Sequence, residues 1–173
     1  PAGTPATFDP DTVVSYEAGL KGETADRSFA LDLAVFRIDW NKIQLLTVVN
    51  GFGVNVNGAD ARSQGAEFTA TLRPTTGFVV SVNAAYTDAK LRDDAPELVG
   101  GLNGDRLPFT PKYAVSINPD YDWSLGGDAK AYIGGSLRFL SKQTGTYDAE
   151  YRAAVGRQRE LPSYVTIDLR AGV

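Results

Sequence analysis

Residues 164–173 have the sequence Tyr-Val-Thr-Ile-Asp-Leu-Arg-Ala-Gly-Val, in which apolar side chains occupy every second position. Successive side chains of a β-strand point to opposite faces of a sheet, so this order separates an apolar face from a polar one. The apolar face would carry Val165, Ile167, Leu169, Ala171 and Val173, and the polar face Tyr164, Thr166, Asp168, Arg170 and Gly172. A helix with this order would place charge around its whole circumference, so the segment is predicted to be a strand.

The same alternation recurs in six earlier segments. The seven predicted strands cover approximately residues 12–21, 27–42, 60–73, 78–91, 111–122, 129–142 and 163–173. The connections are alternately short (22–26, 74–77, 123–128) and long (49–58, 92–110, 143–162). Antiparallel neighbours joined in chain order would place all short turns at one end of the sheet and all long loops at the other. We therefore predict an all-β, antiparallel up-and-down meander, which is the arrangement of outer-membrane barrels.

Two stretches leave the strand assignment open. After residue 35 the apolar positions change parity: the apolar residues become Phe36, Ile38 and Trp40, and the charged ones Arg37 and Asp39. Either a β-bulge exchanges the two faces there, or the strand continues beyond the apolar layer. Residues 43–58 either extend this strand or belong to the loop that follows it.

The composition excludes several classes of function. The chain of 173 residues has no Cys and no His, so a Ser-His-Asp or Cys-His arrangement cannot be built, and no catalytic residue is predicted. A net charge of −4 argues against non-specific binding to nucleic acid, which requires a basic surface. The acidic loop 92–105 offers oxygen ligands for calcium but without the spacing of an EF-hand, and we predict no metal and no cofactor.

The nature of the two faces decides between a membrane protein and a soluble one. The polar face carries many Ser, Thr, Asn and Gly, together with the charged residues Glu17, Lys21, Asp32, Glu67, Arg73, Lys112, Asp168 and Arg170. Such a face suits a water-filled lumen. Aromatic residues near strand ends on the apolar face suit the girdles at the two bilayer interfaces; these are Phe29, Phe78, Tyr86, Tyr113 and Phe139. The alternative is a soluble all-β ligand- or carbohydrate-binding module, whose one buried face produces the same alternation.

Aromatic and basic residues also gather in the long connection 143–162. The candidate ligand-contacting residues there are Tyr147, Tyr151, Arg152, Arg157 and Arg159. If the long loops face outward, these side chains can contact an anionic cargo or lipopolysaccharide. The alternative is that they are ordinary charges of a solvated loop.

Four segments resemble motifs of the TonB-dependent outer-membrane receptors. They are Tyr-Glu-Ala-Gly-Leu-Lys-Gly at 16–22, Phe-Arg-Ile-Asp-Trp-Asn-Lys-Ile-Gln at 36–44, Asn-Gly-Ala-Asp-Ala-Arg-Ser-Gln-Gly-Ala-Glu-Phe at 57–68, and Leu-Pro-Phe-Thr-Pro-Lys-Tyr at 107–113. Their order and spacing agree with the C-terminal part of that family's β-barrel. The matching strands continue to residue 173.

The resemblance implies a receptor in the outer membrane of a Gram-negative bacterium that imports a scarce nutrient, such as a ferric siderophore, cobalamin or an oligosaccharide. It implies energy supplied through TonB, a plug domain inside a 22-stranded barrel, and no chemistry on the cargo. No plug segment is recognised, so the chain is expected to be the partial barrel domain 1–173, paired with strands outside it and embedded in lipid. The lumenal charges Glu67, Arg73, Asp168 and Arg170 would then either contact the plug or pair with one another across strands.

Overall fold

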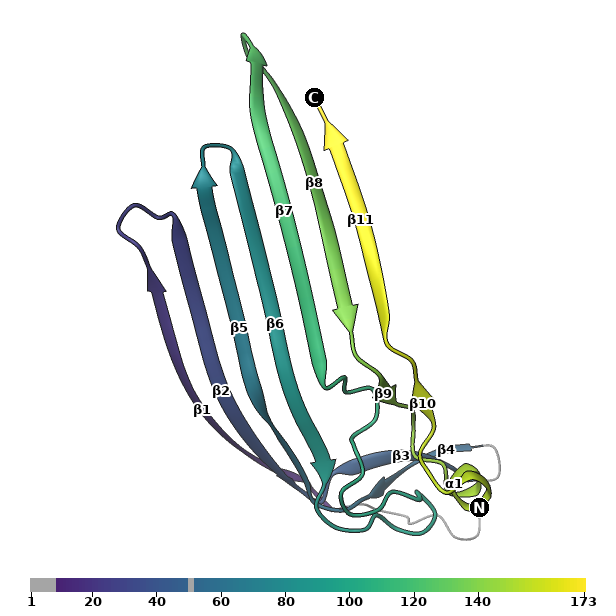
Figure 1. The fold of residues 1–173 in the computed structure, drawn as a ribbon. Helices are drawn as coiled ribbons and strands as arrows, with labels where there is room; N and C mark the ends of the chain where they lie inside the picture. Colours follow the sequence, from purple (N-terminus) through teal and green to yellow (C-terminus); the bar gives the residue numbers. More distant parts are fainter. Residues whose placement is uncertain (1–8, 50–51) are drawn as a thin grey trace.

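The computed structural model describes residues 9–49 and 52–173, and one seven-stranded antiparallel sheet dominates it (Figure 1). Its strands are β1 (Thr12–Glu23), β2 (Phe29–Asn41), β5 (Ala61–Thr75), β6 (Phe78–Leu91), β7 (Tyr113–Gly126), β8 (Ala129–Leu140) and β11 (Tyr164–Gly172). They lie side by side in this order, each paired with its predecessor in the sheet. The predicted meander is confirmed.

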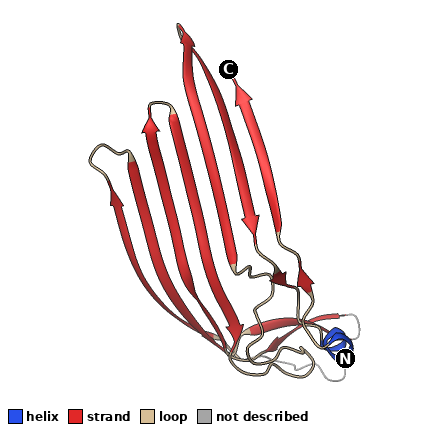
Figure 2. Cartoon of the chain, viewed as in Figure 1, coloured by secondary structure: helices blue, strands red, loops and turns tan. Residues whose placement is uncertain are grey.

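The two ends of the sheet differ in their connections (Figure 2). At one end, short turns join β1 to β2, β5 to β6, and β7 to β8. Gly77, Gly126 and Gly127 adopt positive φ angles of 80°, 103° and 60° in two of these turns, a conformation that glycine reaches without steric cost. At the other end lie the long connections, which contain the smaller elements β3 (Gln44–Val49), β4 (Phe52–Asn57), β9 (Gln143–Thr144), α1 (Ala149–Val155) and β10 (Glu160–Leu161).

The strand register separates an apolar face from a polar face. Residues that lie opposite one another in neighbouring antiparallel strands share a face. One such row crosses all seven strands and is wholly apolar: Leu20, Leu33, Phe68, Ala84, Val115, Phe139 and Val165. The adjacent row lies one residue nearer the short turns on each strand, and it is wholly polar: Lys21, Asp32, Thr69, Asn83, Ser116, Arg138 and Thr166.

The two faces exchange their polarity at the long-loop end, and no β-bulge in β2 causes the exchange. β2 pairs in continuous register with β1 and with β5 through Trp40. The bulge alternative is therefore wrong, and the strand continues beyond the apolar layer. On the formerly apolar face the next rows are Arg37, Gln64 and Asp88, then Asp39, Arg62 and Lys90; on the formerly polar face Trp40, Ala61 and Leu91 lie opposite one another.

A small hydrophobic core fills the polar side of the sheet at this end. Its buried residues are Ile43, Leu45, Val56, Ala59, Ala61, Leu91, Ala95 and Val99, with Trp40, Leu107 and Tyr147 packed against them. They come from the ends of the long strands and from all three long connections. Residues 43–58 neither extend β2 nor form a plain loop: they contain the hairpin β3–β4, although residues 50 and 51 lie outside the described residues.

Two aromatic groups bracket the apolar face. Near the short turns Tyr121 contacts Phe78 edge-on and stacks on Trp123, with ring centroids 6.2 and 5.4 Å apart. Towards the long loops, Tyr86 and Tyr113 lie with centroids 5.5 Å apart. Phe78 and Tyr86 are eight residues apart on β6, roughly 27 Å along the strand. For a strand tilt of about 40° this is roughly 20 Å along the bilayer normal, close to the apolar band of about 25 Å in outer-membrane barrels.

The apolar face of the sheet has no second layer over it within the described residues. Val165, Ile167 and Leu169 are 54%, 67% and 83% exposed. A soluble sandwich would bury these side chains between two sheets. The described part of the chain contains no helix long and apolar enough to cross a membrane.

Adjacent alanines on β6 give a matched test of the two faces. Ala84 lies in the apolar row, whereas Ala85 lies on the polar face opposite Glu67. Once the sheet is closed into a barrel in lipid vesicles, Ala84→Arg should lower the free energy of unfolding by about 2–4 kcal/mol, because a guanidinium would enter hydrocarbon. Ala85→Arg should leave it almost unchanged. Urea titration of both variants measures the difference, and equal effects would contradict the assignment of the faces.

Candidate functional site

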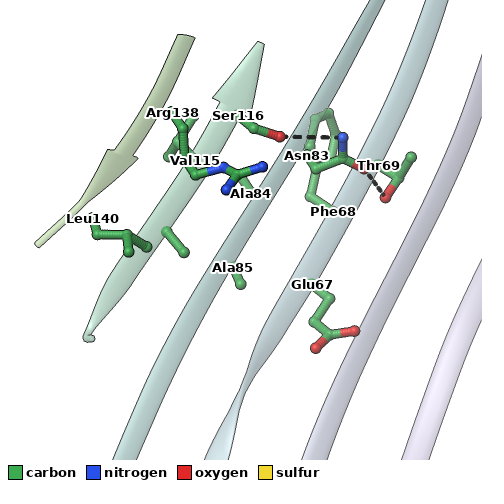
Figure 3. A pocket seen from close by; sticks show the side chains of 11 residues that line it. Glu67, Phe68, Thr69, Asn83, Ala84, Ala85, Val115, Ser116, Arg138 and Leu140 are labelled. Carbon is green, nitrogen blue, oxygen red and sulfur yellow. Dashed lines mark hydrogen bonds between the residues drawn. The ribbon is translucent and has the colours of Figure 1, made fainter. Parts of the chain in front are cut away.

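The polar face forms a continuous hydrogen-bonding wall. Thr69 donates from Oγ1 to Asn83 Oδ1 at 3.1 Å, and Asn83 donates from Nδ2 to Ser116 Oγ at 3.4 Å (Figure 3). A hollow of about 520 Å³ lies over these residues, with Glu67 on one side and Arg138 on the other. Neither Glu67 nor Arg138 has an ion-pair partner within the described residues, so this hollow is flanked by one unpaired charge of each sign.

Only part of the lumenal charge pairs across strands. Arg73 lies 3.6 Å from Glu23 and Arg170 pairs with Asp120, in each case across one intervening strand. Gly134 of β8 lies opposite both members of that second pair, and a Cβ there would clash with the Asp120 carboxylate. The absence of a side chain at this position lets the ion pair pass over β8.

The loop between β8 and β11 is an ordered unit. β9 and β10 pair at its base, with Thr144 opposite Glu160. Asp148 caps α1 by accepting a hydrogen bond from the Tyr151 N–H at 2.8 Å, and Gly156 ends it with a φ of 77°. This helix is not among the elements predicted from the sequence. Asp148 before Ala149–Val155 and Gly156 after it are the N-cap and C-cap signals that identify such a helix.

Helix α1 and its flanks bring the five candidate residues into one loop but give them different partners. Arg152 pairs with Asp105, and both side chains are largely buried. Arg157 lies 3.1 Å from Glu160. Arg159 lies 3.5 Å from Asp148 and places its guanidinium 4.3 Å from the centre of the Tyr151 ring.

Tyr147 holds this loop against the neighbouring one. Its hydroxyl donates to the carbonyl of Arg106 at 3.2 Å, and its ring contacts the loop core. Burial, reinforced by the nearby charge of Asp105, raises the pKa of the Tyr147 phenol well above its usual range. The phenol therefore remains a hydrogen-bond donor under ordinary conditions.

A polar hollow of about 340 Å³ opens beside the Arg152–Asp105 pair. Its lining residues are Gly104, Asp105, Arg106, Thr144, Arg152, Gly156, Arg157, Gln158 and Glu160. The Nε atoms of Arg106 and Arg152 are buried and have no hydrogen-bond partner among the described residues. The hollow therefore brings three arginines together with the carboxylates of Asp105 and Glu160, an excess of one positive charge, which suits an anionic group. Arg106 is not among the site residues predicted from the sequence, because its partners lie in other segments.

The acidic loop 92–105 does not assemble a metal site in the part of the chain that the structure describes. Asp94 accepts a hydrogen bond from the Asn103 N–H at 2.7 Å, and Asp105 is paired with Arg152. These carboxylates stabilise the loop and its contact with α1.

Removing the Tyr147 hydroxyl should loosen the contact between the two loops. Tyr147→Phe loses one hydrogen bond to a carbonyl, worth about 1 kcal/mol, so amide hydrogen exchange over 143–162 should become about fivefold faster. Tyr151→Phe is the control, because the Tyr151 hydroxyl has no partner among the described residues while its ring still lies under Arg159. Equal exchange in both variants would contradict the role given to Tyr147.

The same phenol predicts a pH dependence. Because its pKa is raised in the folded loop, its contribution is fully present below the unfolded value of about 10 and is lost as the pH rises further. Exchange of the loop amides, corrected for the intrinsic pH effect, should therefore accelerate above about pH 10 in the wild type. Tyr147→Phe should show no such acceleration.

Comparison with known proteins agrees with this architecture. Residues 1–173 match the family model described as TonB dependent receptor-like, beta-barrel. The chain is 28% identical over 165 residues to the metal-pseudopaline receptor CntO of Pseudomonas aeruginosa, a match that covers 95% of this chain and 22% of that protein.

Solved receptor structures share the fold. The ferric yersiniabactin uptake receptor FyuA from Yersinia pestis matches with a TM-score of 0.72 and 19% identity, over 94% of this chain and 22% of FyuA. BauA, the ferric preacinetobactin receptor from Acinetobacter baumannii, matches with a TM-score of 0.71 and 22% identity, over 97% of this chain and 24% of BauA. The chain spans less than a quarter of each of these relatives. The resemblance seen in the four sequence motifs is confirmed: the chain belongs to the TonB-dependent outer-membrane receptors and matches their β-barrel domain.

Proposed function

We propose that this chain acts, as part of a complete receptor, in the active import of a metal chelate across the outer membrane. The observation that best supports this proposal is the unbroken polar row that crosses all seven strands directly beside an unbroken apolar row. A wall with these two faces separates lipid from a water-filled passage. No covalent chemistry on the cargo is required of it.

The names of the relatives support a metal chelate rather than cobalamin or an oligosaccharide. CntO is named for metal-pseudopaline, FyuA for ferric yersiniabactin and BauA for ferric preacinetobactin. The arginine-lined hollow beside α1 favours a cargo that carries negative charge.

Arg157 and Arg159 are the residues best placed to exchange their present partners for the cargo. Both are exposed, and the carboxylate that each one contacts has a second partner. Glu160 also receives a hydrogen bond from Lys142 at 2.9 Å, and Asp148 also caps α1. A cargo carboxylate can therefore draw either guanidinium away without leaving a bare carboxylate behind. Arg152 and Tyr147 would instead position the loop, and Tyr151 would support Arg159 from below.

The cargo would then pass along the polar wall. In the complete receptor a plug domain would fill the lumen, with TonB supplying the energy to move it. Glu67 and Arg138 would be its natural contacts on this wall, since each is a charge without an ion-pair partner within the described residues.

The double substitution Arg157→Gln and Arg159→Gln in the complete receptor tests cargo capture. Loss of charge-assisted hydrogen bonds, worth about 1.5–3 kcal/mol each, should weaken binding of a carboxylate-bearing ferric siderophore at least about tenfold. Arg27→Gln with Lys130→Gln removes the same charge near the short-turn end and should leave binding unchanged. Binding to the purified receptor is measured for a panel of ferric siderophores and for cyanocobalamin.

Two measurements test the cargo class and the energy source separately: the ligand panel, and uptake in a strain without TonB. Import of cyanocobalamin but of no ferric siderophore would overturn the cargo class. Uptake of iron that persists when TonB is deleted would overturn the energy source. Unchanged siderophore binding in the double variant would remove Arg157 and Arg159 from the capture site.

A further inference from the structure

A group of charged side chains lies on the lipid-facing side of the sheet, just beyond the Tyr86–Tyr113 pair. We call it the cationic belt; it consists of Arg37, Arg62, Lys90, Arg106 and Lys112, with the carboxylates of Asp39 and Asp88. The belt continues the apolar face of the sheet. Its strand residues fall at every second position counted from the apolar residues of the same strands; they are residues 37, 39, 62, 88 and 90. They occupy two successive rows across three neighbouring strands, so the belt is contiguous.

Each carboxylate of the belt is shared between two cations. Asp39 accepts from Arg37 Nε at 2.9 Å and from Arg62 Nε at 2.5 Å. Asp88 lies 3.0 Å from Lys90 Nζ and 3.2 Å from Arg106 Nη1. Each group of three therefore keeps one positive charge in excess.

Lys112, which was expected on the polar face, instead adds a further cation on the outer side, at the level of the aromatic pair. Its ammonium lies 5.7 Å from the centres of both the Tyr86 and the Tyr113 rings. The belt then has a net charge of +3, whereas the whole chain has −4. Positive charge is thus concentrated at one depth of one face.

That depth corresponds to the headgroup layer of a bilayer. The two rows lie two and four residues beyond Tyr86, roughly 7 and 14 Å along the strand. With a strand tilt of about 40° these distances become roughly 5 and 10 Å along the bilayer normal. The headgroup region occupies about 5–8 Å on each side of the hydrocarbon core, within reach of long Arg and Lys side chains.

A hollow of about 190 Å³ adjoins the belt and continues its charge. Its lining includes Arg106, Lys112, Tyr113, Lys142 and Glu160. Glu160 is itself shared between Lys142 and Arg157, at 2.9 and 3.1 Å. The hollow therefore retains an excess of cations beside an aromatic ring.

We propose that the cationic belt binds the phosphate groups of lipopolysaccharide in the outer leaflet of the outer membrane. Guanidinium and ammonium groups are the side chains that recognise phosphate, and the tyrosine pair beneath them contacts the upper part of the acyl chains. The belt would anchor the receptor at a fixed depth. This proposal depends on the placement of the chain in the membrane and not on the identity of the cargo.

The double substitution Arg62→Gln and Lys90→Gln tests the belt with its remaining ion pairs intact. Asp39 keeps Arg37, Asp88 keeps Arg106, and the net charge of the belt falls from +3 to +1. Each cation near an anionic membrane surface contributes a factor of about five to binding, so retention of lipid A should fall about 25-fold. The complete receptor is delipidated and reconstituted in phosphatidylcholine vesicles with and without lipid A. Retained lipid A is counted by native mass spectrometry, and the unfolding temperature is followed by heat-modifiable mobility on gels.

The matched control removes two positive charges near the short-turn end of the sheet, far from the belt, as Arg27→Gln with Lys130→Gln. The control should retain lipid A and the stabilisation it confers, whereas the belt variant should lose both. Lys112→Gln, which disturbs no ion pair, gives the same readout if the double variant does not fold.

Three outcomes would overturn the proposal. The first is equal retention of lipid A by the belt variant and the wild type. The second is stabilisation by inorganic phosphate in phosphatidylcholine vesicles as strong as that by lipid A, which would indicate a site for free anions. The third is loss of cargo binding in the belt variant while lipid retention is unchanged, which would assign the belt to the cargo.

Discussion

The structure depends on one requirement, that backbone N–H and C=O groups inside a membrane find their partners within the protein. A meander of long antiparallel strands meets it with the simplest connectivity, since each strand hydrogen-bonds to the next one in the sheet. Within the described residues, the outer edges of β1 and β11 are the two unpaired edges of the seven-stranded sheet. Both edges require pairing with further strands in hydrocarbon, where each unpaired group costs several kcal/mol.

The exchange of faces at the long-loop end follows from the same requirement. Inside the bilayer the outer side of the wall must be apolar and the inner side can be wet. Beyond the bilayer the outer side meets headgroups and water, so Arg37, Asp39 and Arg62 are tolerated there. The inner side then supplies Trp40 and Leu91 to a core that holds the loops over the polar wall. One continuous strand thus serves two environments without a change of register.

In the proposed function, the loops and the wall would have different tasks. The wall has repeated geometry and few specific contacts, which suits passage. The loops have buried partners, such as Tyr147 on Arg106 and Arg152 on Asp105, which hold the exposed Arg157 and Arg159 in place. A rigid base below exposed, exchangeable arginines would favour the selective capture of an anionic chelate that we propose.

The amino-acid sequence by itself determined the seven strands, their order and the identity of the two faces, because alternation with a period of two is a local property of each strand. It also contained the signals for α1 in Asp148 and Gly156. Only the tertiary structure decided the partners of the candidate residues, because Arg152 and Asp105 are 47 positions apart and Tyr147 and Arg106 are 41 apart. It also decided that β2 leaves the apolar layer without a bulge, since register is a relation between strands. Contacts of this kind arise from the packing of separate segments, and no pattern within one segment encodes them.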